Sequence, residues 1–472
     1  MSKIVMVGGI RLGFAVAKAL NLPSVSAIRS RLNLPHLRPS IGFPTKTEVM
    51  TNIESFFGPN TGKSSHSRTG FSLMIDEIAV ESRLRYDIQQ DAIVGACREH
   101  VRTKYVGGLS DKENPLDTLL DIQAKLNSGE FHRAAESTMA ALARFGDSDY
   151  NPVIILASGT CKAEKAIDQL RWIELIFQSW KESPFGESLH GPIWSVTTDG
   201  DAKRRLALFQ LCMKIKLSPT SDLYRLIGHL PLLNLFCGPS FITHDGDYKH
   251  IEKRLASAMR SRSGILVNGA HITPKMLVNY LRCSGDLSES RLLSFFDGTD
   301  PQNVPKANSL LNHLYMASWL PSLSSRPENK PFTLLGEVLG SFVHPFTVPS
   351  MSLSKQVTSL SKCGHLLYSL YHIDGAKFLP GQLIYDMEAT IKNVVFCIAK
   401  TQLVDTTLPF YVLQSGTDRL EGRFGTYRTI TSDRNGDLLQ MCEHAAGAQQ
   451  IDQIYLAHPD WNRTPYRLSL DG

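Results

Sequence analysis

The sequence predicts an α/β fold in which a mixed β-sheet is interrupted by a mostly helical insertion. Apolar runs of strand length alternate with amphipathic helical patterns from Phe71 to Lys216, and this alternation stops at Ser218 and returns at Pro380. The expected organisation is a helical and basic lead-in at 1–70, a first part of the sheet domain at 71–217, a helical insertion at 218–379 and the final part of the sheet domain at 380–472.

Composition limits the class of protein. The chain has 472 residues, a formal net charge of +5 and a pI of about 8.6. That length indicates two or three lobes, and the mildly basic charge permits a polyanionic partner. No run approaches the roughly 18 apolar residues of a membrane span, and the N-terminus lacks an apolar signal core. We expect a nuclear or cytoplasmic protein that does not enter a membrane.

Eight cysteines are scattered along the chain without a Cys-x-x-Cys pair. This pattern indicates neither a zinc module nor a disulfide framework, so we expect reduced and mostly buried thiols.

Two glycine-rich stretches imitate nucleotide-binding loops. Gly8, Gly9 and Gly13 lack the spacing of a dinucleotide fingerprint, and the segment from Gly58 to Lys63 has one residue too few between its glycines for a phosphate loop. We interpret both as lead-in segments, next to a basic stretch from Arg29 to Arg38. A nucleotide-dependent enzyme using either loop is the third and weakest hypothesis.

The central strand is expected at Phe71–Glu81, an apolar run that contains the carboxylates Asp76 and Glu77. Burial of an unpaired carboxylate costs several kcal/mol, and a bound cation is its strongest partner. The alternative is that the strand ends at Ile75 and that Asp76 caps a turn.

Two more extended segments, Arg83–Ile88 and Ala92–Cys97, complete a predicted three-stranded antiparallel meander. A long helical stretch that includes Ala134–Leu142 should follow it. Val153–Ala157 then predicts a buried strand, followed by a helix.

Pro192–Thr198 predicts the next strand, which ends at Asp199, and a basic helix spans Lys203–Lys216. This order of elements is typical of ribonuclease-H-like folds. Asp199, like Asp76, stands near the end of a core strand, where α/β sheets bind ligands.

The insertion contains an acidic and basic stretch from His244 to Arg254. We interpret it as a helix start with Asp247 as N-cap, because the acidic spacing of a calcium loop is absent.

The C-terminal part predicts a helix at Pro380–Lys400, a strand at Pro409–Gln414 and a turn at Gly416–Asp418 that leads into a last helix. Glu421 lies on the inward face of that helix among arginines. Such a glutamate forms either a structural ion pair or part of a carboxylate cluster.

Taken together, the strings LMIDEIAVESRLRYD, WSVTTDGDAKRRLALF, GDYKHIEKRL and GTDRLEGRFGTYRTI resemble the catalytic core of P-element and THAP-type transposases, and more closely the uncharacterised fungal proteins that share this core. The family motif Asp-x-Leu-Glu-x-x-Phe is matched by Asp418, Leu420, Glu421 and Phe424.

The resemblance implies a ribonuclease-H-like sheet split by an insertion that is associated with GTP binding in the P element. It implies an Asp-Asp-Glu triad of Asp76, Asp199 and Glu421 that holds Mg²⁺ or Mn²⁺ and acts on DNA phosphodiesters, and a homo-oligomer.

Two departures from the family are expected. With the predicted meander, the fourth strand is Val153–Ala157, which carries no Asp at its end, so Asp199 would belong to the fifth strand and Asp201 is an alternative ligand. No Cys/His DNA-binding module precedes the core. The competing hypothesis is therefore a catalytically inactive, domesticated remnant that binds nucleic acid or protein.

Overall fold

The computed structural model describes residues 12, 14–20, 35–58, 69–146, 151–430 and 436–458. Its main sheet has five strands in the spatial order β5-β4-β1-β6-β9. β1 is antiparallel to β4 and β4 is antiparallel to β5, whereas β6 is parallel to β9. The bounds are Phe71–Ala79 for β1, Glu136–Arg144 for β4, Val153–Thr160 for β5, Ile193–Thr198 for β6 and Thr243–Gly246 for β9. Numbered along the chain, these strands have the order 3-2-1-4-5, so the predicted mixed sheet is confirmed.

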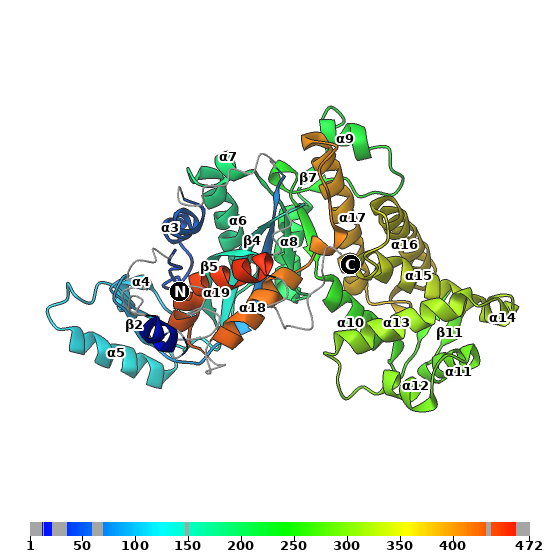
Figure 1. The fold of residues 1–472 in the computed structure, drawn as a ribbon, viewed down its shortest axis with the longest axis horizontal. Coiled ribbons are helices and arrows are strands. Elements are labelled where there is room, and N and C mark those ends of the chain that lie inside the picture. The colour runs from blue at the N-terminus through cyan, green and yellow to red at the C-terminus, as the bar shows by residue number, and fades with distance from the viewer. Residues whose placement is uncertain are drawn as a thin grey trace. The chain divides into compact units, whose positions relative to one another are not determined.

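The chain divides into two compact units, of which the first takes in residues 1–193 and 419–467 and the second residues 194–418 and 468–472 (Figure 1). The helices of the first unit include α3 (Lys46–Phe57), α4 (Thr103–Val106), α5 (Pro115–Ser128), α6 (Ala166–Glu182), α7 (Glu187–His190), α18 (Asp418–Ile430) and α19 (Leu438–Ala457).

The second strand of the sheet, β4, replaces a helix that the sequence predicts at Ala134–Leu142. Ala, Leu and Met favour helices, but all seven residues from Ser137 to Ala143 are buried. A strand covered on both faces loses the alternation of polar and apolar residues that identifies strands in a sequence. The helix prediction was therefore wrong, and tertiary packing decided the outcome.

The predicted meander is also wrong in part. β2 (Arg85–Asp87) and β3 (Ala92–Val94) form the expected antiparallel hairpin, but this hairpin is a separate two-stranded sheet. Its apolar residues pack with α4, α5 and Leu439 of α19 in a small core of their own.

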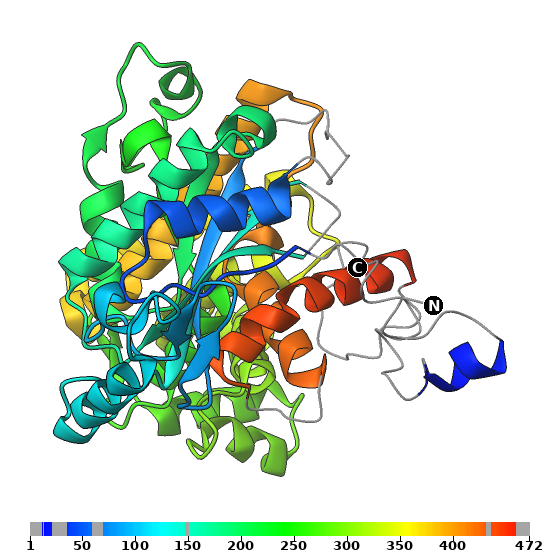
Figure 2. The ribbon, with the colours of Figure 1, turned by 90° about the vertical axis from the view of Figure 1, so that its left-hand side faces the viewer.

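The outer strand of the first unit is β5, and its backbone has partners outside the strand ladder. Ser40 N donates to Ala157 O at 2.8 Å, and Arg98 N donates to Gly159 O at 2.9 Å. α3 packs against β5 and α6, and α19 also contacts β5. Figure 2 shows α3, the blue helix near the middle of the view, in front of the strands.

The second unit is mostly helical. Its helices are α8 (Ala202–Cys212), α9 (Asp222–Ile227), α10 (Tyr248–Met259), α11 (Pro274–Ser284), α12 (Glu289–Phe296), α13 (Val304–Trp319), α14 (Pro321–Ser324), α15 (Lys330–Thr347), α16 (Leu353–Asp374) and α17 (Gly381–Val404). Its short strands outside the main sheet are β7 (Ile215–Lys216), β8 (Phe236–Cys237), β10 (Ile265–Val267) and β11 (Ala270–Ile272). The 3₁₀ turns among its described residues are η2 (Pro239–Phe241), η3 (Pro327–Asn329), η4 (Gly375–Lys377) and η5 (Val412–Gln414).

Of two elements predicted near the end of this unit, the helix is confirmed and the strand is not. The long helix predicted at Pro380–Lys400 is confirmed by α17, which packs against β9, α10 and α16. The strand predicted at Pro409–Gln414 is wrong, because its end forms η5. Gln414 N and Ser415 N donate to carbonyls three residues earlier, which replaces strand pairing with local turns.

None of the described helices is both long enough and apolar enough to cross a bilayer.

Candidate functional site

Asp76 lies inside β1 and not at a turn. Its strand continues to Ala79, and Asp76 is paired with Met139 of β4. The first five residues of β1 are buried, whereas Asp76 and Glu77 are half-buried. Asp76 Oδ1 accepts a hydrogen bond of 2.8 Å from Glu77 N. The alternative interpretation, in which the strand ends at Ile75, is therefore excluded.

Glu77 is held by a buried polar network of the first unit. Thr138 Oγ1 donates to Glu77 Oε1 at 2.9 Å, and Arg98 Nη1 donates to Thr138 Oγ1 at 3.0 Å. Arg98 also forms an ion pair with Glu164, and both side chains are almost completely buried. Trp172 Nε1 donates to the second carboxylate oxygen of Glu164 at 3.3 Å. This network fixes Glu77 from β4, α6 and the segment after β3.

Asp199 follows directly after β6, a strand whose six residues are all buried. Its side chain is 28% exposed and lies 3.9 Å from Arg204 Nη1. Asp201, the alternative ligand, has another role: its carboxylate accepts from Arg204 N at 2.9 Å and caps α8.

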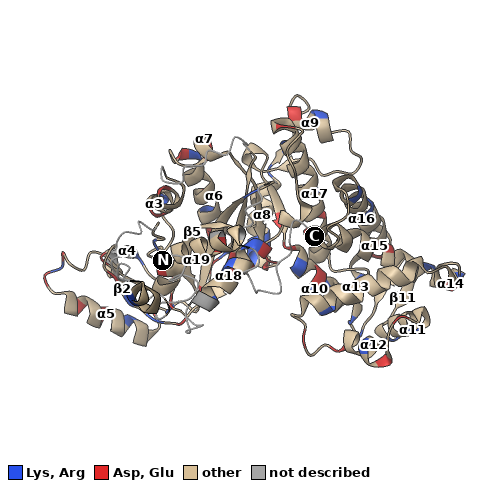
Figure 3. Cartoon of the chain, in the orientation of Figure 1, with Lys and Arg blue, Asp and Glu red and all other residues tan. Residues whose placement is uncertain are grey.

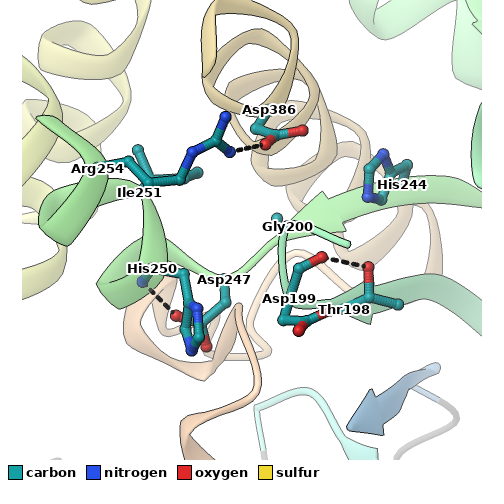
Figure 4. Close-up of a pocket in the computed structure, with 10 residues that line it drawn as sticks. Thr198, Asp199, Gly200, His244, Asp247, His250, Ile251, Arg254 and Asp386 are labelled. Carbon is teal, nitrogen blue, oxygen red and sulfur yellow. Dashed lines mark hydrogen bonds and ion pairs between the residues drawn. The ribbon is translucent and has the colours of Figure 1, made fainter. Parts of the chain in front are cut away.

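Asp199 lines a small pocket of the second unit (Figure 4). The pocket encloses about 10 Å³, roughly the space that one water molecule needs. Its other polar side chains come from β6, β9, α10 and α17: Thr198, His244, Asp247, His250, Arg254 and Asp386. Asp386 accepts two hydrogen bonds from Arg205, at 2.7 and 2.8 Å, and also pairs with Arg254.

Burial lowers the pKa of His244 to about 4, so this pocket residue is neutral at pH 7. Burial by itself would raise the pKa of the Asp247 carboxyl. This pKa is nevertheless lowered, because His250 and the hydrogen-bond donors of Thr417 favour the carboxylate.

Asp247 is the N-cap of α10, as predicted, since it accepts from His250 N at 2.9 Å. Its other oxygen accepts from Thr417 N, also at 2.9 Å, and from Thr417 Oγ1. Asp245 of β9 accepts from Gly416 N at 2.8 Å, and Lys249 pairs with Asp418. These contacts fix the turn at Gly416–Asp418 that precedes the helix with Glu421.

Glu421 lies in the second turn of α18 and is half-buried. The arginines beside it in the sequence hold this helix against the sheet of the first unit. Arg419 Nη1 donates to Arg144 O at 3.0 Å, and Arg423 Nη2 donates to Pro152 O at 2.9 Å. In Figure 3, where Lys and Arg are blue, α18 carries blue segments.

The strand order shows that one expected departure from the family, the position of Asp199 on the fifth strand, is wrong. Because β4 is the second strand of the sheet and β5 the third, β6 is the fourth. Asp199 therefore follows the fourth strand, while Asp76 lies on the first.

A comparison with solved structures finds the same fold. The Drosophila P element transposase strand transfer complex matches with a TM-score of 0.60 over 98% of this chain and 91% of that chain, at 12% sequence identity. The chain has the fold of the P element transposase. No family model and no curated protein matches the sequence.

Within this P element transposase fold, Asp245 and the Oδ2 atom of Asp247 both bind the turn before α18. Neither contact was predicted from the sequence. Asp247 was identified only as a helix cap, although it also binds the turn before α18. The string His244-Asp-Gly-Asp-Tyr-Lys-His250 was the available signal, because a helix cap needs one carboxylate and this string supplies two within three residues. Residues 59–63 of the glycine-rich stretch that begins at Gly58, the glycines at 8, 9 and 13, and residues 29–34 of the basic stretch lie outside the described residues.

Proposed function

We propose that this chain is a transposase-derived DNA-processing protein that cleaves or transfers DNA phosphodiesters with divalent metal ions. The observation that carries the proposal is the placement of Asp76 on the first strand and of Asp199 after the fourth, on strands β1 and β6 that are neighbours in the 3-2-1-4-5 order. We propose that Asp76, Asp199 and Glu421 are the metal ligands, and that Glu77 joins them.

The donor set fits the metal. Carboxylate oxygens are the ligands that Mg²⁺ and Mn²⁺ prefer. Such ions activate a water or a 3′ hydroxyl and stabilise the leaving oxygen of an in-line displacement. The protein's own part is to hold these carboxylates rigidly: Thr138 supports Glu77, and the turn bound by Asp245 and Asp247 supports the start of α18.

DNA is the proposed substrate. The matched structure is a strand transfer complex of a transposase, and the net charge of +5 favours a polyanion.

GTP is proposed as a ligand of the second unit. A cavity of about 660 Å³ there is lined by Arg254, Lys377 and several serines between α10 and β10. Cationic and hydroxyl groups of this kind can bind phosphates. Binding of a fluorescent GTP analogue that Lys377→Ala weakens would support this ligand, and equal binding by both proteins would remove it.

Nicking of supercoiled plasmid tests the catalytic proposal. We expect activity in Mg²⁺ or Mn²⁺ that falls by at least about 100-fold in Asp76→Asn, Asp199→Asn and Glu421→Gln. Asp201→Asn is the matched control, because asparagine also caps helices and should leave both nicking and α8 intact. Calorimetric titration with Mn²⁺ gives a second readout in which the three variants should bind more weakly than the control.

The alternative is a catalytically inactive remnant that binds nucleic acid. It predicts no nicking by any variant, together with DNA binding that survives all of these substitutions and weakens steeply with salt. Equal nicking by folded Asp76→Asn and wild-type protein would exclude the proposed metal ligands.

A further inference from the structure

Two cysteines and two histidines of the first unit meet at one end of β4 and β5. One ligating atom of each of Cys97, His100, His132 and Cys161 lies within 4.8 Å of the other three. The sequence gives no sign of this group, because its members come from three separate segments and only Cys97 and His100 have a metal-like spacing.

The sulfur–nitrogen distances lie at or below the spacing of ligands around a tetrahedral ion. Cys97 Sγ is 3.0 Å and Cys161 Sγ is 3.6 Å from His100 Nδ1. Ordinary zinc–sulfur and zinc–nitrogen bond lengths place sulfur and nitrogen ligands about 3.6 Å apart in a tetrahedral site. The rings of His100 and His132 have centroids 3.9 Å apart, so the second imidazole completes the group.

The two sulfurs converge on one imidazole nitrogen. A neutral imidazole has one acceptor nitrogen, and both sulfurs approach the same atom, His100 Nδ1. A cation placed among the four side chains would be shared by all of them.

Backbone contacts hold the ligands in place independently of their side chains. Cys97 N donates to His132 O at 2.9 Å, and His100 N donates to Cys97 O at 3.3 Å. Cys161 N donates to the carboxylate of Glu99 at 3.3 Å, and Thr160 Oγ1 donates to the same carboxylate. The site is therefore built before any ion binds.

We propose that Cys97, His100, His132 and Cys161 form a structural zinc site. Two sulfur and two imidazole ligands in a closed set are typical of structural zinc and unsuited to Mg²⁺. The ion joins the start of β4, the end of β5 and the segment after the β2–β3 hairpin. It is independent of the carboxylates proposed for catalysis.

The first test is the metal content of the full chain purified without chelators. We expect one zinc per chain by mass spectrometry of metals, and cobalt exchange should give the visible absorption and sulfur-to-metal charge-transfer bands of a tetrahedral thiolate site. Wild-type protein that takes up cobalt without these bands, or in which Cys97 and Cys161 are joined by a disulfide, overturns the proposal.

Variants assign the ligands. His132→Ala is preferred because this ligand is exposed and its loss disturbs the fold least. It should weaken zinc binding at least about tenfold, and Cys161→Ser should reduce the charge-transfer band. Cys283→Ser and His365→Ala, at exposed residues outside the group, are matched controls that should retain full zinc. Unchanged zinc binding in folded His132→Ala and Cys161→Ser would refute the assignment.

Discussion

Thr138 Oγ1 donates a hydrogen bond of 2.9 Å to Glu77 Oε1, and these two residues are direct cross-strand partners in β4 and β1. The same hydroxyl accepts from the buried Arg98 guanidinium. One small side chain therefore connects a proposed metal ligand to the interior of the first unit.

Replacing Thr138 with valine should disrupt this connection. The variant keeps the shape of the side chain but leaves an Arg98 donor and a Glu77 acceptor without this partner, so we expect a loss of about 1–3 kcal/mol in the free energy of unfolding. Urea denaturation measures it. Thr358→Val on the exposed face of α16 is the control and should change stability by less than about 0.5 kcal/mol. A Thr138→Val protein as stable as wild type would contradict the network's role.

The ion pair of Arg98 and Glu164 should be sensitive to loss of one partner. Because both side chains are buried, Glu164→Gln leaves an uncompensated charge and should cost about 3–5 kcal/mol in stability. Replacing both residues with methionine should cost less than the sum of the single changes, which a double-mutant cycle will show. Lys46→Met, which breaks a solvent-exposed pair with Glu182, should have no measurable effect. Additive losses in the cycle would argue against coupling between the two charges.

Stability should fall with rising pH because of Glu252. Burial raises the pKa of this carboxyl from 4.5 to about 7, so between these values the unfolded chain loses its proton while the folded chain keeps it. The contribution of Glu252 to the free energy of unfolding therefore decreases across that window, by up to about 3 kcal/mol.

Glu252→Gln imitates the protonated form and should remove this part of the pH dependence. The variant should be more stable than wild type at pH 8 and similar to it at pH 4, as measured by urea unfolding at each pH. Glu328→Gln, at an exposed position, should leave the curve unchanged. If the Glu252→Gln and wild-type curves run parallel from pH 4 to pH 8, Glu252 is not the group responsible.

Gly159 of β5 should not tolerate a side chain. A Cβ there would lie 2.7 Å from Ala96 O and 2.8 Å from Ala134 Cβ, so Gly159→Ala should destabilise the protein by about 1–3 kcal/mol. Gly425→Ala in α18 meets no atom within 4 Å and should instead stabilise it by about 0.5–1 kcal/mol. Thermal unfolding of both variants measures the two effects, and shifts of the same sign would contradict this packing.

The sequence predicted the elements whose patterns are local. The apolar runs of β1, β5 and β6, the long helix α17 and the Asp247 cap were all recognised, because each depends on neighbouring residues. β4 was not, since a strand buried on both faces and rich in alanine has the composition of a helix. Counting β2 and β3 as strands of the main sheet while missing β4 displaced Asp199 from the fourth strand to the fifth.

Contacts between distant segments could not be predicted from the sequence. The four proposed zinc ligands span residues 97–161 in three segments. The pairing of Ala96 with Arg133 and the β4–β5 ladder bring these segments together. The acidic residues that hold the turn at Gly416–Asp418 are about 170 positions earlier in the chain. No periodicity or spacing in a single sequence reports such distances.

The backbone partners of β5 also bear on solubility. A strand at the border of a sheet offers unpaired amide and carbonyl groups that can recruit another chain and start aggregation. Here the carbonyls of Ala157 and Gly159 already accept from Ser40 and Arg98. The segments that contain these donors therefore act as a cover that keeps this border from templating intermolecular β-structure.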